Sequence, residues 1–319
     1  MENTIYHISF LQAIAIGLLQ GISELFPVSS LGHTVLVPSW TGGTWATLVR
    51  QESQAESPYL AFVVGLHLAT AVVLLGFYLR EWARLVAGFF RSLARRKTVT
   101  DEERLAWLIV IATVPVGAIG LALEHQFRVL FAKPVAAALF LMVNGVILLA
   151  GELHRRRQEA GPAELTARLV DTGRPTRPDT RLVPMDAAAE RELSRIGVLS
   201  AAVIGASQAL ALFAGISREG VAMVGGLFRG LNNENALRFS FLLSTPVIFA
   251  AGALKVPDLL GPLGDGIRPQ VIAGSLAAAA TSVFAVVFLA RYFRTRTLMP
   301  FAIYSLAFGL ASVIRFGLF

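Results

Sequence analysis

The sequence has 319 residues, of which 55% are hydrophobic and only 15% are charged. Soluble domains carry about 25% charged residues, so this composition excludes an ordinary soluble protein and indicates a membrane protein. The 28 Lys and Arg exceed the 21 Asp and Glu and leave a net charge of +7, which suits nucleic acid or the anionic cytoplasmic face of a membrane. The absence of cysteine excludes disulfides, thiolate metal sites and a cysteine nucleophile.

In chain order, the first residues, MENTIYHISF, lack the basic stretch and the cleavage site of a removable signal peptide. We therefore expect the N-terminus to belong to the fold. Six later stretches come close to the about 20 mostly apolar residues that a bilayer-spanning helix needs. They lie at residues 59–79, 105–123, 134–151, 236–256, 270–290 and 298–318.

Two further apolar regions, residues 8–37 and 196–231, are each interrupted by polar and helix-breaking residues. The first contains GLLQGISELFPVSSLGH, and the second contains GASQALALFAGISREGVAMVGG. Irregular backbone at membrane depth is tolerated only where it is buried in protein or lines a wet cavity. Each region is therefore predicted to form a re-entrant helix hairpin.

The basic residues predict which side of the membrane each link faces. Three links are rich in Arg, at residues 80–104, 152–195 and 291–296, and the positive-inside rule makes them cytoplasmic. The basic excess is thus explained by topology, and we expect no nucleic-acid partner. The first hairpin must then enter from the outer side and the second from the inner side, each followed by three spanning helices.

This order of segments predicts two halves of opposite orientation in an all-α polytopic membrane protein. The halves are residues 1–151, with the hairpin 8–37, and residues 196–319, with the hairpin 196–231; residues 152–195 form a basic, flexible cytoplasmic loop. A shift of 188 positions supports the repeat, because four residues of the first hairpin then fall on identical residues of the second. Inverted repeats place their binding site near the bilayer midplane. The identical pairs are Gly17 and Gly205, Gln20 and Gln208, Ser29 and Ser217, and Gly32 and Gly220.

Polar side chains in the first hairpin need a reason, since an ionisable group in the membrane costs about 2.5–3.5 kcal/mol on insertion scales. Gln20 and Glu24 are four residues apart and share one helix face. A structural interpretation is that Glu24 caps a helix or pairs with another structural group, while the serines form hydrogen bonds with backbone groups that the helix break leaves unpaired. The functional interpretation is a polar pocket built from Gln20, Glu24, Ser29, Ser30 and His33.

The second hairpin supplies Ser217, Arg218 and Glu219 within AGISREG. The planar guanidinium of Arg218 at membrane depth suits the binding of a phosphate or carboxylate ligand. Its structural interpretation is a salt bridge with Glu24 or Glu219, and the two interpretations are compatible in a site without ligand. Gly215 lets the backbone approach closely, and amides at a helix start can bind an anion. The residues alone therefore predict an anion-handling site at the membrane midplane with acid and base groups beside it.

His67 and Asn144 also lie inside predicted spanning helices. A lone polar residue in such a helix more often joins helices than binds a ligand, so the sequence assigns these two no functional role.

At these motifs the sequence resembles the undecaprenyl-diphosphatase family of bacterial membrane enzymes associated with bacitracin resistance. QGISELFPVSSLGH resembles the family's (E/Q)xxxE motif and its P-V-S-S-x-G-H continuation. AGISREG followed by FSFLLSTPV resembles P-G-x-S-R-S-x-x-T and the downstream F-S-F-L-L-x-x-P. RTLMPFAIY extends the similarity to the C-terminal region, so it covers the hydrophobic chain end to end.

The resemblance implies hydrolysis of undecaprenyl pyrophosphate to undecaprenyl phosphate and inorganic phosphate in the bacterial plasma membrane. The site would open to the outer face and use a divalent cation, Mg²⁺ or Ca²⁺. Such an enzyme recycles the lipid carrier of peptidoglycan synthesis, supports cell shape and confers bacitracin resistance. A homodimer is compatible with the sequence.

Carried over by position, the resemblance implies roles for nine residues. The catalytic set is Glu24, Ser30, His33 and Arg218, in which Glu24 also binds the metal and either Ser30 or His33 is the nucleophile. The substrate-binding set is Gln20, Ser29, Gly215, Ser217 and Glu219.

Three positions depart from the family pattern. Ala214 replaces the Pro of the second motif, Glu219 replaces its second Ser, and Ala222 replaces its Thr. Glu219 could help to hold the metal, or it could pair with Arg218 and weaken substrate binding. Ala222 removes a hydroxyl that could contact phosphate.

Two other functions remain open from the sequence. Opposed re-entrant hairpins in inverted halves are also a transporter architecture, which allows a transporter or flippase of a polyprenyl phosphate or another anionic substrate. A structural dimer whose polar hairpins only pack is the third interpretation.

Overall fold

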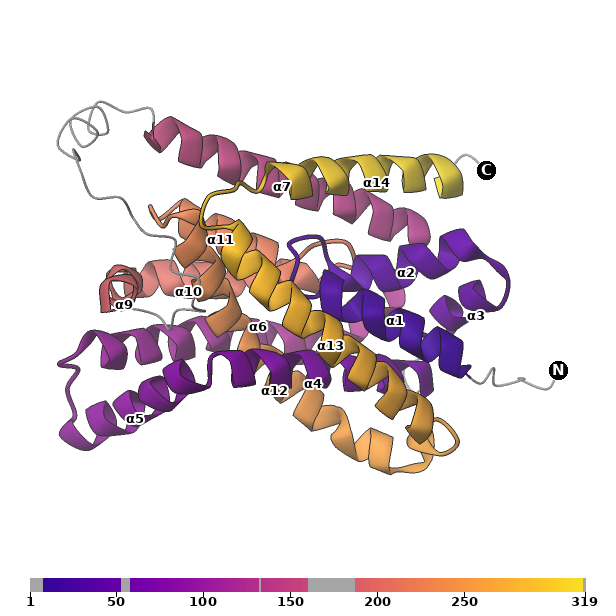
Figure 1. Cartoon of the computed structure of the whole chain (residues 1–319), viewed down its shortest axis with the longest axis horizontal. Helices are drawn as coiled ribbons and strands as arrows, with labels where there is room; N and C mark the ends of the chain where they lie inside the picture. Colours follow the sequence, from indigo (N-terminus) through magenta and orange to yellow (C-terminus); the bar gives the residue numbers. More distant parts are fainter. Residues whose placement is uncertain (1–7, 53–57, 132, 160–186, 318–319) are drawn as a thin grey trace.

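The structure, a computed structural model, describes residues 8–52, 58–131, 133–159 and 187–317. Across these ranges all regular secondary structure is helical (Figure 1), which confirms the predicted all-α class. The middle of the predicted flexible loop, residues 160–186, lies outside the described residues.

The first apolar region folds as two helices separated by a break. α1 spans Phe10–Ser23 and α2 spans Ser30–Thr41, with irregular backbone at residues 24–29. The predicted interruption is therefore confirmed. A short helix that the sequence did not indicate, α3 (Gly43–Glu52), follows.

The basic link at residues 80–104 is mostly helical. α4 (Pro58–Phe77) leads almost directly into α5 (Leu79–Arg95), and the two helices are bent by 82°. In α5 the arginines and the apolar residues repeat at helical spacing, a pattern typical of a helix at a membrane surface. The uniformly apolar character is lost at the bend between α4 and α5, but helix formation continues through α5.

The second apolar region is interrupted as well. The helices α10 and η1 are followed by irregular backbone at residues 213–217 before α11 begins. The two ends of the predicted loop 152–195 belong to α7 and α9. The remaining elements are α6 (Asp101–Phe131), α7 (Pro134–Glu159), α9 (Ala187–Ser194), α10 (Val198–Ser207), η1 (Gln208–Leu212), α11 (Arg218–Leu227), α12 (Asn233–Leu260), η2 (Pro262–Gly264), α13 (Arg268–Tyr292) and α14 (Met299–Gly317).

Within the described residues, five helices are long and apolar enough to cross a membrane, or six if the bent pair α4 and α5 counts as one span. α6, α7, α12, α13 and α14 are the five. Each of them contains most of one predicted apolar stretch, and α4 contains most of the sixth. The protein is therefore an integral membrane protein with five to six apolar spans.

Small residues let the hairpin helices pack closely on long helices. α1 lies along α13, and α7 lies along α14 (Figure 1). A Cβ atom added to Gly17 of α1 would collide with the carbonyl oxygen of Gly274 in α13. A Cβ atom added to Gly205 of α10 would collide in the same way with the carbonyl oxygen of Ala112 in α6. Gly17 and Gly205, paired by the sequence repeat, thus permit equivalent backbone contacts.

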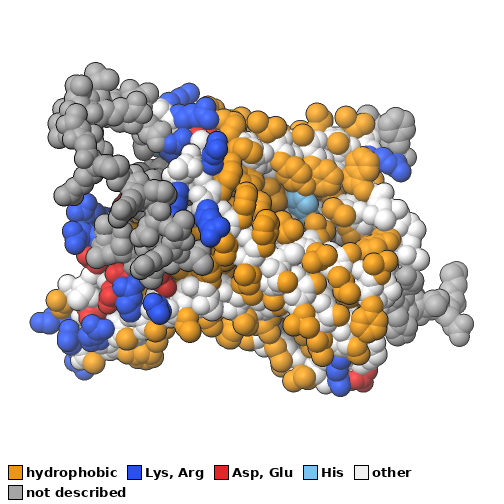
Figure 2. Space-filling model, in the orientation of Figure 1, with side chains coloured by type: hydrophobic (Ala, Val, Ile, Leu, Met, Phe, Trp, Pro, Cys, Tyr) orange, Lys and Arg blue, Asp and Glu red, His pale blue; other side chains and the backbone are white. Residues whose placement is uncertain are grey.

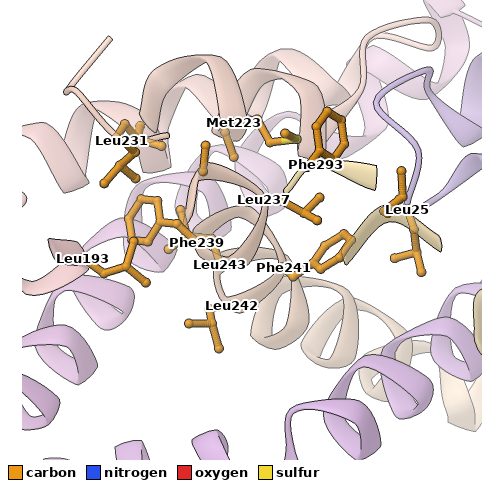
Figure 3. Close-up of a cluster of buried hydrophobic side chains, with 14 of the residues drawn as sticks. Leu25, Leu193, Met223, Leu231, Leu237, Phe239, Phe241, Leu242, Leu243 and Phe293 are labelled. Atoms are coloured by element: carbon orange, nitrogen blue, oxygen red, sulfur yellow. The ribbon is translucent and has the colours of Figure 1, made fainter. Parts of the chain in front are cut away.

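A continuous apolar core joins the first break to the second half of the chain. Leu25, within the break after α1, is fully buried with Met223 of α11, Phe241 of α12 and Phe293 beside α13 (Figure 3). Inside a membrane such close packing stabilises the structure through van der Waals contacts, because lipid tails are as apolar as these side chains. The irregular backbone is therefore held by packing and not by helical hydrogen bonds alone.

Charged side chains gather at one end of the molecule. Lys and Arg side chains cluster around α5 and the nearby end of α7, while the visible middle of the surface is mainly hydrophobic (Figure 2). An apolar belt between polar ends is the surface that a bilayer requires. Assignment of the basic end to the cytoplasm stays a prediction.

Candidate active site

The two helix breaks start their following helices in the same way. Ser29 precedes α2, and its side-chain oxygen accepts a hydrogen bond from the Gly32 amide at 3.2 Å. Ser217 precedes α11, and its side-chain oxygen accepts from the Gly220 amide at 3.1 Å. Both serines are N-caps, which supply an acceptor to an otherwise unsatisfied amide. The serine and glycine pairs found by the 188-residue shift thus share one capping hydrogen bond, although the backbone of Ser29 has a positive φ and that of Ser217 is extended.

The backbone at both breaks is unusual. Ser29 has a φ of +69°, a left-handed conformation that few residues other than glycine adopt. Gly215 has a φ of +117°, and a Cβ atom there would collide with the Ala137 carbonyl oxygen of α7. The close approach that Gly215 permits is therefore to α7, and its predicted contact with substrate stays a prediction.

Asn144 of α7 bridges the two breaks. Its side-chain nitrogen donates to the Pro27 carbonyl at 2.9 Å, and its side-chain oxygen accepts from the Ser217 amide at 3.0 Å. The Gly215 amide also donates to the Ser29 hydroxyl oxygen at 3.1 Å. These bonds fix the start of α2 against the start of α11, although the breaks are almost 190 residues apart.

Glu24 is the centre of the polar cluster and is 3% exposed. Its Oε1 accepts from an Arg218 guanidinium nitrogen at 3.0 Å, so the salt bridge weighed from the sequence is confirmed. Its Oε2 accepts from Gln20 Nε2 at 3.1 Å and from the Ser30 hydroxyl. The Nε2 atom of His67, on α4, lies 3.3 Å from the same Oε2.

Arg218 is the first residue of α11, and its side chain is 18% exposed. Among the described residues, its guanidinium bonds one oxygen of Glu24, and its buried Nε has no hydrogen-bond partner there. A guanidinium carries five N–H donors. Arg218 can therefore hold Glu24 and still offer donors to an anionic ligand.

His33 lies in the first turn of α2 and makes two side-chain contacts. Its Nδ1 is 2.7 Å from the Ser29 carbonyl oxygen, which can only accept, so Nδ1 carries the hydrogen. Its Nε2 is 2.8 Å from the hydroxyl of Tyr304 on α14, and the two rings are stacked. Both ring nitrogens are thus occupied by partners other than Ser30 and Glu24.

Glu219 is a second buried carboxylate beside the first, 2% exposed. It interacts electrostatically with both Arg218 and Glu24, and it lies near Ser244 of α12. Its Oε1 has no hydrogen-bond partner among the described residues. The residue that departs from the family motif therefore faces the same cluster.

The donor set suits a cation that is shared with the substrate. No group of three or more His, Cys, Asp or Glu that could hold a metal occurs within the described residues. Mg²⁺ is commonly bound by one or two carboxylates, water and substrate phosphates. Glu24 and the unpartnered oxygen of Glu219 provide carboxylates for that kind of coordination.

The structure brings together most of the residues that the sequence singled out. Gln20, Glu24, Ser30 and Arg218 are in direct contact, while Ser29 and Ser217 cap the adjoining helices. Three further residues belong to the cluster; the sequence analysis named two of them without assigning a functional role and did not single out the third. In the sequence, each of them is marked only as a polar residue within an apolar helix, and such residues are rare because a polar group is costly to place inside a membrane. These residues are His67, Asn144 and Tyr304.

Comparison with known proteins is consistent with this geometry. The family model described as "Bacitracin resistance protein BacA" matches residues 13–311. The chain is 52% identical to "Undecaprenyl-diphosphatase 2" of Frankia alni, covering 98% of this chain and 99% of that protein. It is 52% identical to "Undecaprenyl-diphosphatase" of Mycolicibacterium paratuberculosis over the same shares, and 40% identical to "Undecaprenyl-diphosphatase" of Granulibacter bethesdensis over 95% of each chain. The chain therefore belongs to the bacitracin resistance protein BacA family.

Proposed function

We propose that this protein is an undecaprenyl-diphosphatase of the bacterial membrane. It hydrolyses undecaprenyl pyrophosphate to undecaprenyl phosphate and inorganic phosphate, which returns the lipid carrier to peptidoglycan synthesis and confers bacitracin resistance. The observation that carries the proposal is the contact of one buried carboxylate, Glu24, with both a serine hydroxyl and an arginine. Relatives that are 52% identical over nearly the whole chain bear the name of this activity.

The pyrophosphate head group is bound where the two helix starts meet. Arg218 donates to the phosphate oxygens, and the first amides of α2 and α11 add further donors. Phosphoryl transfer depends mainly on positioning and on stabilising the charge of the transferred group. The lipid tail lies among the apolar helices.

Ser30 is the nucleophile in this mechanism. Its hydroxyl already donates to Glu24, which accepts the proton as Ser30 Oγ bonds to the terminal phosphorus. The bond from that phosphorus to the bridging oxygen breaks, and undecaprenyl phosphate leaves. Water then adds to the phosphorus, both of its protons stay on the released phosphate, and Glu24 returns a proton to the departing Ser30 oxygen.

His33 has a supporting role in this scheme. Its ring nitrogens are engaged with the Ser29 carbonyl and the Tyr304 hydroxyl. A nucleophile needs a free lone pair directed at the substrate, and here Tyr304 occupies the only lone pair of the neutral ring. His33 instead holds the tight turn that directs Ser30 toward Glu24.

A divalent cation, Mg²⁺ or Ca²⁺, is proposed to accompany the substrate. Glu24 and Glu219 would hold it together with the phosphate oxygens, and when bound it would neutralise charge on the pyrophosphate.

The finer topology is also a proposal. It comprises six transmembrane helices and two re-entrant hairpins, 8–37 and 196–231, in inverted repeats at residues 1–151 and 196–319, joined by the cytoplasmic segment 152–195. Equivalent caps at Ser29 and Ser217 support the repeat. In this arrangement the site opens to the outer face of the membrane. A homodimer stays a prediction.

The test is phosphate release by the purified protein in liposomes that contain undecaprenyl pyrophosphate and Mg²⁺ or Ca²⁺. The wild type should release one phosphate per lipid, and Glu24→Gln should lower the rate about 10³-fold, since general acid–base groups typically supply 10²- to 10⁴-fold. Movement of the head group across the bilayer without phosphate release would instead establish the transport alternative. An unimpaired Glu24→Gln variant would contradict the proposed role of the carboxylate.

A further inference from the structure

His67 is the polar residue of the cluster that neither the sequence motifs nor the proposed mechanism uses. It lies in the apolar helix α4, and its side chain is 17% exposed. Its Nδ1 lies 2.9 Å from the Val63 carbonyl oxygen one turn earlier, and its Nε2 lies 3.3 Å from Glu24 Oε2. The ring therefore connects the backbone of α4 to the central carboxylate.

The Val63 contact fixes how the ring is held. A carbonyl oxygen can only accept, so Nδ1 carries a hydrogen and donates it. This bond anchors the imidazole to its own helix and directs Nε2 at Glu24. The Glu24 carboxylate accepts hydrogen bonds and donates none, so Nε2 must also carry a hydrogen, and His67 holds Glu24 as a doubly protonated imidazolium.

The two oxygens of Glu24 face different partners, and this asymmetry indicates how His67 could position the carboxylate. Oε1 faces Arg218, whereas Oε2 faces Ser30, Gln20 and His67. Arginine prefers to bind a carboxylate through two parallel hydrogen bonds. When His67 is lost, only Gln20 and the Ser30 hydroxyl still hold Oε2, and the carboxylate can turn both oxygens toward Arg218 and away from Ser30.

We propose that His67 is a positioning residue that holds Glu24 Oε2 on the Ser30 side of the site. The inference rests on the proposed phosphatase function and adds to it a residue on α4, outside both hairpins. His67 acts through Glu24 Oε2, which receives the Ser30 proton, and has no described contact with Ser30 itself, so its loss should lower kcat and leave KM nearly unchanged. Misplacement of a catalytic group by about 1 Å costs roughly 100-fold, and loss of an orienting residue roughly 10- to 100-fold.

Two amide substitutions separate the Glu24 contact from the Val63 contact. In His67→Gln the amide group takes the place of Nε2, so it can reach Glu24. In His67→Asn the amide group takes the place of Nδ1, so it can reach only Val63. We expect His67→Gln to retain kcat within a few-fold and His67→Asn to lose about 10- to 100-fold in kcat.

Thr70→Val is the matched control on the same helix. Thr70 is fully buried, donates to the Leu66 carbonyl at 3.2 Å and accepts from Ser282 at 3.2 Å, and neither of these bonds involves Glu24. This variant perturbs the packing of α4 without touching the site. It should lower the thermal unfolding temperature and leave kcat within a few-fold of wild type.

The assay is phosphate release from undecaprenyl pyrophosphate, with kcat and KM determined for each variant. Equal kcat values for His67→Asn and His67→Gln, beside an active wild type, overturn the role of His67 and leave the proposed function intact. A fall in kcat for Thr70→Val as large as that for His67→Asn also overturns it. A wild type that releases no phosphate overturns the proposed function itself, and the role of His67 with it.

Discussion

The two helix breaks share a local design but carry different chemistry. In each, a serine caps the following helix by binding the amide of a glycine three residues later. At the position of Glu24, however, the second break has Leu212, and at the position of Ser30 it has Arg218. The acid and the hydroxyl therefore come from the first break and the cation from the second.

This difference shows that neither break is a site by itself. A carboxylate buried at 3% exposure without a partner would be strongly unfavourable, and Arg218 supplies that partner from the other half. Hydrogen bonds from Asn144 and Gly215 set the distance between the breaks. The repeat therefore provides two breaks of similar local structure, and the residues that differ between the breaks together form one charged site.

The largest effect is expected from a change to the cation of the second break. Arg218→Lys keeps the charge but loses the planar fork that can serve Glu24 and phosphate together. We expect kcat/KM for undecaprenyl pyrophosphate to fall about 10²-fold, the scale of a lost transition-state donor. A rate within three-fold of wild type would contradict the use of Arg218 for both partners.

A smaller effect is expected when the bridge between the breaks is removed. Asn144→Leu leaves the Ser217 amide and the Pro27 carbonyl without their partner, which costs about 1–3 kcal/mol for each buried group. The thermal unfolding temperature should fall. Activity should fall up to about 100-fold, because the two helix breaks lose their alignment. A loss of stability with an unchanged kcat in the folded fraction would show that Asn144 contributes to folding and not to activity.

The smallest effects distinguish the two glutamines that the repeat pairs. Gln20 donates to Glu24 at 3.1 Å, whereas both side-chain polar atoms of the buried Gln208 lack partners among the described residues. Gln20→Met should lower kcat only several-fold, because Arg218, Ser30 and His67 still hold the Glu24 carboxylate when this one hydrogen bond is lost. Gln208→Met should leave kcat unchanged and raise the unfolding temperature slightly. Equal losses in both variants would show that the second break also takes part in the chemistry.

Much of the fold could be predicted because its signals are local. Apolar length identified the spanning helices, and polar residues within apolar runs identified both breaks. The helical character of α5 and the presence of α3 were not predicted, because charge counting locates a link without specifying its backbone. Helices of this amphipathic kind are stabilised by the membrane surface, which a search for uniformly apolar segments overlooks.

The site was predictable wherever its residues lie in the two motifs. Glu24, Ser30 and Arg218 come from such motifs, and the structure places them in contact. His67, Asn144 and Tyr304 come from separate helices, and only the packing of α4, α7 and α14 brings them to the cluster. Contacts between side chains that are 40 to 270 residues apart depend on tertiary structure, which one sequence does not specify.

A comparison of two neighbouring serines tests most directly whether Ser30 is the nucleophile. Ser30 donates to Glu24, whereas Ser29 caps α2, so Ser30→Ala removes the nucleophile and Ser29→Ala removes about 1 kcal/mol of capping. Phosphate release from undecaprenyl pyrophosphate by the two purified variants is the measurement. We expect Ser30→Ala to be inactive and folded Ser29→Ala to retain measurable turnover. Turnover by Ser30→Ala at the wild-type rate would contradict this role of Ser30.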